Sequence, residues 1–111
     1  MSATLIQRQL DAYNAHDIPA LLACYAHDAK QSEFPHKLLR QGHDAIAQRM
    51  HERFADSSLR AELLQRMCMA DMVIDHERLH FTEAGVAKTT AIIAIYQIQN
   101  QLIQHQWIKF S

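Results

Sequence analysis

The chain has 111 residues, a formal net charge of -1, 49% apolar residues and 21% charged residues, a balance typical of a globular protein. This length supports a single hydrophobic core, so we treat residues 1–111 as one domain. Charges of both signs are interspersed without a basic stripe, so nucleic-acid binding is not expected. The longest apolar run, Ala91 to Tyr96, falls far short of the roughly 20 residues of a membrane span.

The N-terminus shows no basic start followed by an apolar stretch, so we expect no signal peptide and a cytoplasmic protein. Two cysteines, Cys24 and Cys68, do not make a disulfide framework in such a chain. Both have apolar neighbours, and we expect them to be buried thiols.

The first half of the chain is predicted to form two helices, a short hairpin and a third helix. Apolar side chains recur at helical spacing up to Tyr13, and Asp17 is a plausible N-cap for a second helix that contains Pro19 and Tyr25. Residues 30–34 and 37–41 are expected to form a short hairpin that ends at Gly42. Residues 43–54 then show the clearest helical pattern, with Ile46, Met50 and Phe54 four residues apart.

The second half of the chain reads mostly as strands. Residues 89–98 are rich in β-branched side chains, residues 100–101 form a turn, and residues 102–110 return as the last strand. The periodicity of residues 59–83 is ambiguous between helix and strand. Helices followed by a meander of strands predict an α+β fold with an antiparallel sheet.

His76-Glu77-Arg78-Leu79-His80 matches the zinc-peptidase pattern H-E-x-x-H, which requires a helix to bring both histidines to one metal ion. The β-branched residues just before it and the turn at Ala84-Gly85 favour a strand instead. In a strand the two histidines stand about 13 Å apart, at roughly 3.3 Å per residue. Zinc binding is therefore a remote alternative, and we expect no metal or other cofactor.

Several short motifs together resemble the nuclear transport factor 2-like superfamily, in particular its SnoaL-like and ketosteroid-isomerase-like branch. They are Asn14-Ala15-His16-Asp17, Tyr25-Ala26-His27-Asp28-Ala29, Gly42-His43-Asp44-Ala45-Ile46, Val73-Ile74-Asp75-His76-Glu77, Ile95-Tyr96-Gln97-Ile98 and the closing Ile103 to Trp107. The resemblance implies three helices packed on a strongly curved antiparallel sheet that forms a cone-shaped pocket. It also implies a homodimer and a small apolar ligand, but this fold hosts many activities.

In the ketosteroid isomerases an acidic residue late in the first strand moves a proton, and a tyrosine and a protonated aspartate stabilise the enolate oxygen. The resemblance places Glu33 at the position of the base. It places Gln9 at the tyrosine position and Ala94 at the aspartate position. A true steroid isomerase is therefore not expected. Glu33 is either a pocket carboxylate or a solvent-exposed strand residue beside Lys37.

Other side chains are candidates for binding the ligand. They are Tyr13, Tyr25, Met50, Phe54, His76 and Trp107. In the strand that contains His76, either Asp75 and Glu77 or His76 and Arg78 point into the cone, and the sequence does not decide which. Trp107 lies on a stripe that lines either the pocket or a dimer surface.

Two functions follow from this reading. The first is a small isomerase, cyclase or hydrolase that acts on an apolar carbonyl-bearing substrate, with Glu33 as the general base. The second is a non-catalytic module that binds a hydrophobic ligand or a protein in the same cone.

Overall fold

Helices precede most of the strands in the chain, and the computed structural model describes residues 2–111. Within this range the helices are α1 (Ser2–Asn14), α2 (Ile18–Leu22) and α3 (His43–Phe54). The strands are β1 (Tyr25–Glu33), β2 (Lys37–Gln41), β3 (Arg60–Met69), β4 (Met72–Glu83), β5 (Val86–Gln99) and β6 (Leu102–Phe110). None of the helices in this range is long and apolar enough to cross a membrane.

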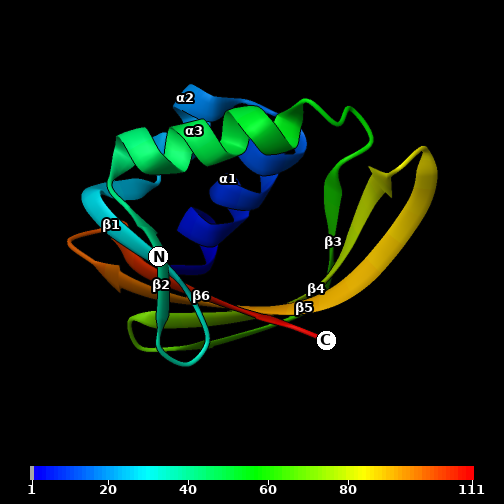
Figure 1. The fold of residues 1–111 in the computed structure, drawn as a ribbon. Helices are drawn as coiled ribbons and strands as arrows, with labels where there is room; N and C mark the ends of the chain where they lie inside the picture. The colour runs from blue at the N-terminus through cyan, green and yellow to red at the C-terminus, as the bar shows by residue number, and fades with distance from the viewer. Residues whose placement is uncertain (1) are drawn as a thin grey trace.

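The strands form one curved sheet in the order β2-β1-β6-β5-β4-β3, and the helices pack on its concave side (Figure 1). Neighbouring strands are antiparallel except β1 and β6, which are parallel, so the sheet is mixed. The register shifts in β1, β3 and at Gln97 of β5. Such irregularities bend strands and increase their twist, and they account for the curvature that forms the cone.

Burial alternates along β4, which resolves the ambiguity of residues 72–83. Val73, Asp75, Glu77 and Leu79 are buried on the concave side, whereas the residues between them are more exposed. This two-residue period is that of a strand with one covered face. Two of the inward residues are carboxylic acids, so the sequence of β4 does not show the apolar alternation of an ordinary half-buried strand.

The Asn-Ala-His-Asp motif after α1 ties the helices to the sheet. The Asn14 side chain donates to the carbonyl oxygen of Ala61 at 2.9 Å and accepts from its N–H at 2.8 Å. His16 Nε2 lies 2.7 Å from the carbonyl oxygen of Leu59. Asp17 caps α2 by accepting from the Ala20 N–H at 3.1 Å, as predicted. The motif therefore has a structural role in this chain.

Two expectations about individual residues are wrong. Tyr25 is the first residue of β1 rather than part of the second helix, because its backbone pairs with Ile103 of β6. Cys24 is buried as expected, but Cys68 is exposed. Cys68 lies near the end of β3, an edge strand that has a neighbour on one side only.

Candidate functional site

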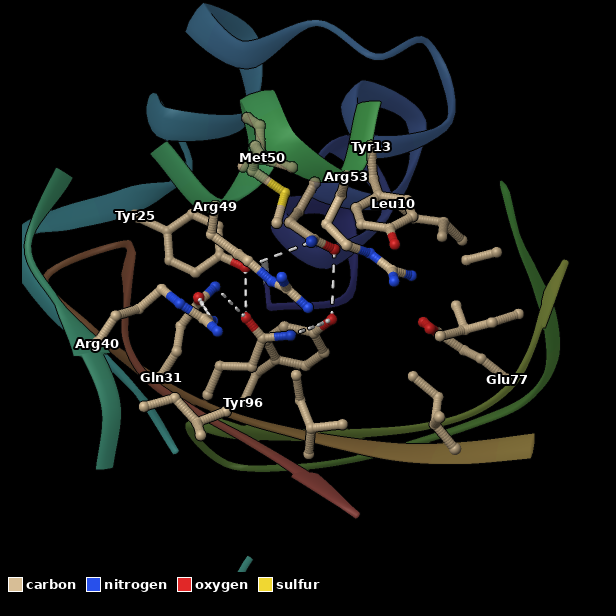
Figure 2. A pocket seen from close by; sticks show the side chains of 18 of the residues that line it. Leu10, Tyr13, Tyr25, Gln31, Arg40, Arg49, Met50, Arg53, Glu77 and Tyr96 are labelled. Atoms are coloured by element: carbon tan, nitrogen blue, oxygen red, sulfur yellow. Dashed lines mark hydrogen bonds between the residues drawn. The ribbon is translucent and has the colours of Figure 1, made fainter. Parts of the chain in front are cut away.

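A cavity of about 290 Å³ lies between α1, α3 and the concave face of the sheet (Figure 2). Its apolar wall comes from all three helices and from the sheet, and includes Leu10, Leu21, Met50, Leu79, Ile92 and Ile108. Ligand pockets typically range from about 300 to 1,000 Å³ and combine apolar walls with a few polar groups. The cavity thus has the size and lining of a site for a small molecule.

One wall of the cavity carries a closed ring of four hydrogen bonds (Figure 2). The Tyr25 hydroxyl donates to Gln106 Oε1 at 2.6 Å, and Gln106 Nε2 donates to the Tyr96 hydroxyl at 3.3 Å. The Tyr96 hydroxyl donates to Gln9 Oε1 at 3.4 Å, and Gln9 Nε2 donates back to the Tyr25 hydroxyl at 3.3 Å. Each member therefore donates once and accepts once within the ring.

The ring extends toward the cavity mouth through Gln31 and Arg40. Gln31 Nε2 donates to Gln106 Oε1 at 2.9 Å, and Arg40 donates to Gln31 Oε1. Burial raises the pKa of both Tyr25 and Tyr96, so both phenols stay protonated at neutral pH. This wall therefore offers fixed hydrogen-bonding groups, but none of its tyrosine or glutamine side chains can take a proton from a substrate at neutral pH.

Two carboxylic acids of β4, Asp75 and Glu77, have different surroundings. Asp75 is fully buried, and Arg66 donates to both of its oxygens, at 2.7 and 2.9 Å. Arg66 also donates to Gln7 at 2.9 Å. Glu77 lines the cavity, and it is only 4% exposed. Burial, reinforced by the negative charge of Asp75, raises the pKa of Glu77 to about 8.

Three arginines also line the cavity. Arg49 and Arg53 lie one turn apart on α3, and Arg40 comes from β2 (Figure 2). Arg53 lies close enough to Tyr13 for its charge to lower the pKa of that phenol, but burial outweighs this effect and leaves the pKa raised. The cavity therefore combines an apolar wall, a buried acid and several fixed positive charges.

The family of SnoaL-like domains matches residues 6–106, nearly the whole chain. The chain belongs to this family. A comparison with curated protein sequences finds no significant match. The resemblance inferred from the short sequence motifs is thus confirmed.

Solved structures share the fold of this SnoaL-like domain at low sequence identity. A cystatin-fold protein from Novosphingobium aromaticivorans is 16% identical with a TM-score of 0.86, over 95% of this chain and 94% of that one. A nuclear transport factor 2-like protein of unknown function from Burkholderia pseudomallei is 13% identical with a TM-score of 0.87, over 99% and 90%. A protein with a ketosteroid isomerase-like fold from Catenulispora acidiphila, solved in complex with trimethylamine, is 11% identical with a TM-score of 0.86, over 100% and 88%. Similarity at these identities concerns the fold alone.

The structure brings five of the candidate residues of the SnoaL-like domain to the cavity: Gln9, Tyr13, Tyr25, Glu33 and Met50. Glu33 combines the two readings left open by the sequence. It lines the cavity, yet its side chain is 42% exposed and lies 4.0 Å from Lys37 Nζ. It is therefore at the rim of the cavity rather than in its depth.

Phe54, His76 and Trp107 lie elsewhere. Phe54 points away from the cavity along α3 and stacks on His16, with ring centroids 4.5 Å apart. His76 belongs to the outward-facing set of β4, because Asp75 and Glu77 occupy the inward set. Trp107 pairs with outward-facing Ile95 and stacks on His105 at 3.7 Å. The expectation that these three residues line the pocket is not met.

The H-E-x-x-H segment lies in the middle of β4, as the strand interpretation predicted. His76 and His80 lie on the outward face, and His80 Nε2 is 3.0 Å from Glu62. Glu77 points to the other side of the sheet. Across residues 2–111, no group of three or more His, Cys, Asp or Glu side chains is placed to hold a metal ion.

The sequence reasoning did not identify several residues that line the cavity: Gln31, Arg40, Arg49, Arg53, Tyr96 and Gln106. One signal was available for Arg49 and Arg53. They lie four residues apart and flank Met50, which is on the buried side of the same helix. The glutamines and Tyr96 gave no signal, because polar residues in strands are usually on the exposed face.

Proposed function

We propose that this SnoaL-like domain binds a small, mainly apolar carbonyl compound in the cone and transfers a proton with Glu77. The observation that carries the proposal is a buried carboxyl group with a pKa of about 8 on the wall of an apolar cavity. A group that titrates near neutral pH is suited to general acid–base catalysis. Glu77 supplies such a group on the wall of the cavity.

The same cavity offers hydrogen-bond donors for the oxygen of a bound carbonyl group. The Tyr13 hydroxyl and the Arg53 guanidinium both line it, on the helical side. Donors placed where negative charge develops lower the barrier to enolate formation. We propose that these two residues stabilise the enolate oxygen. Gln9 is not free to do so because it is held in the hydrogen-bonded ring, and the Ala94 side chain has no donor.

Glu33 is the alternative base that the family resemblance favours. Glu33 lies at the rim and close to Lys37, and an exposed carboxylate keeps its hydration. We therefore expect Glu33 to be a weaker base than a carboxylate buried inside the cavity. The two assignments make opposite predictions for the variants Glu77→Gln and Glu33→Gln.

The test is exchange of α-hydrogens for deuterium in a panel of small cyclic and aryl ketones, followed by NMR in D₂O. We expect the wild-type protein to accelerate exchange, Glu77→Gln to abolish the acceleration, and Glu33→Gln to retain it. Loss in Glu33→Gln alone would reassign the base. Ketones that bind without any catalysed exchange would favour the non-catalytic binding module, the second candidate function.

We also propose that the chain forms a homodimer through the convex face of the sheet. Met67, Ile74, Ile95 and Trp107 are register partners on four successive strands and form an apolar row on that face. Met67 is 57% exposed in the single chain. Ile74, Ile95 and Trp107 are partly exposed, and a contiguous apolar patch at the surface is typical of an interaction site.

A further inference from the structure

The three arginines of the cavity have no matching set of carboxylates. The chain as a whole carries a net charge of -1, yet Arg40, Arg49 and Arg53 converge on one small cavity. The two acids that line it do not neutralise them, because Glu33 lies beside Lys37 and Glu77 is mostly protonated at neutral pH. The interior of the cavity is therefore positively charged.

The ion pairs of residues 2–111 leave two of the three arginines without a carboxylate partner. Arg49 is the exception, because its Nη1 lies 3.6 Å from Glu52 Oε2 in a partly exposed ion pair. Neither Arg40 nor Arg53 has a carboxylate oxygen within 4.0 Å among the described residues. Burial, followed by the positive charge of Arg49, lowers the pKa of Arg40. The arginines thus repel one another in a partly desolvated space.

We infer that the ligand of this cavity carries a carboxylate, which Arg49 and Arg53 bind while an apolar body fills the space above Leu79 and Ile92. The inference rests on the proposed small-molecule function and specifies its substrate class. A guanidinium group offers a planar pair of donors that matches the two oxygens of a carboxylate. Arg53 is the strongest candidate, because Arg40 already donates to Gln31 and Arg49 lies 3.6 Å from Glu52. Arg49 lies one turn before Arg53 on the same helix and is the second candidate.

The apolar body is required by the rest of the wall. Leu10, Met50, Leu79 and Ile92 surround the cavity on several sides, and they gain from contact with hydrocarbon rather than water. A small inorganic anion would leave this surface hydrated. A molecule with one anionic end and one apolar end satisfies both parts of the cavity at once.

A matched pair of probes tests the inference: 3-phenylpropionate and its uncharged amide, measured by isothermal titration calorimetry. We expect the wild-type protein to bind the carboxylate at least about tenfold more tightly, since hydrogen bonds between charged groups are the stronger ones. Arg53→Gln and Arg49→Gln should each lose most of this preference. Arg60→Gln, an exposed arginine of β3 outside the cavity, is the matched control and should keep the preference.

The possible outcomes separate this inference from the proposed function. Equal affinities for the two probes, or a preference that survives in every one of the two variants that folds, would overturn the anionic substrate class and leave small-molecule binding intact. Failure of both probes to bind would contradict the inference and the proposed binding function together. Because the two arginines are separate positions on α3, one folded variant suffices for the test.

Discussion

Asp75 and Glu77 project from the same face of β4, but Arg66 binds both oxygens of Asp75 while Glu77 faces the cavity. Arg66 therefore holds one carboxyl group of the pair by two hydrogen bonds, whereas the other is mostly protonated at neutral pH. The negative charge of Asp75 adds to burial in raising the pKa of Glu77. Burial first and Asp75 second therefore raise the pKa of the residue that we propose as the acid–base group, whereas the charge of Arg66 lowers it.

Glu77→Gln should stabilise the protein at pH 8 but not at pH 5. In the unfolded chain Glu77 ionises near its ordinary value of 4.5, whereas in the folded chain its pKa is about 8. Between these values the folded state holds a proton that the unfolded state releases, so the free energy of unfolding falls as pH rises. The variant cannot lose stability in this way, because glutamine does not ionise. The expected gain in the free energy of unfolding at pH 8 is roughly a few kcal/mol, since each pKa unit corresponds to about 1.4 kcal/mol. Urea unfolding of both proteins at the two pH values measures it.

Glu33→Gln is the control for this experiment, since it removes a carboxyl group at the rim rather than in the depth of the cavity. It should leave the difference in stability between pH 5 and pH 8 unchanged. A wild-type protein and a Glu77→Gln variant with the same pH dependence would show that Glu77 is ionised in the folded state at neutral pH.

Asp75→Asn should destabilise the fold by about 3–5 kcal/mol, because it leaves the guanidinium of Arg66 without its charged partner. The Arg66 side chain is only 14% exposed, so water cannot replace the lost contacts fully. The double variant Arg66→Met/Asp75→Leu should recover much of the loss, because it removes both charges. Midpoints of urea unfolding provide the comparison. A cost of less than about 1 kcal/mol for Asp75→Asn, as for an exposed pair, would contradict this account.

Tyr25→Phe and Tyr96→Phe should each cost about 1–3 kcal/mol, because each leaves buried partners in the ring unsatisfied. The costs should not add, since both hydroxyls belong to the same closed set of hydrogen bonds. A double-variant cycle by chemical unfolding measures the coupling. Strict additivity would mean that the four bonds act independently and do not form a cooperative ring.

Asn14→Ala should lower the free energy of unfolding by about 1–3 kcal/mol, because the side chain satisfies both backbone groups of Ala61. Gln48→Ala on the exposed side of α3 is the control and should change stability by less than about 0.5 kcal/mol. Thermal unfolding of the three proteins suffices. Equal effects of the two substitutions would remove the structural role assigned to the motif after α1.

Met67→Glu should convert a dimer into a monomer, because it places a charge in the apolar row on the convex face. Native mass spectrometry of wild type and variant at micromolar concentration gives the oligomeric state. Gln48→Glu, which adds the same charge on the helical side, should leave the dimer intact. A monomeric wild-type protein would overturn the proposed interface.

Local patterns were enough to predict most of the elements. Helical spacing of apolar residues located α1 and α3, and the turns at Pro35-His36, Ala84-Gly85 and Asn100-Gln101 separated the strands. The prediction for Tyr25 was wrong because its partner is Ile103, 78 positions away. Strand pairing at that distance leaves no trace in the local sequence.

The sequence by itself determined the family, the α+β class and the helices and strands whose apolar periodicity is clear, such as α1, α3, β5 and β6. Tertiary structure alone decided that Glu77 rather than His76 faces the cavity, because a strand has two faces and only the packing of α1 and α3 selects the covered one. It also brought Arg40 from β2 to Arg49 and Arg53 of α3, and Gln106 to Tyr25 and Tyr96. These side chains line one cavity because the sheet is curved, and its curvature depends on pairing between strands that are far apart in the sequence.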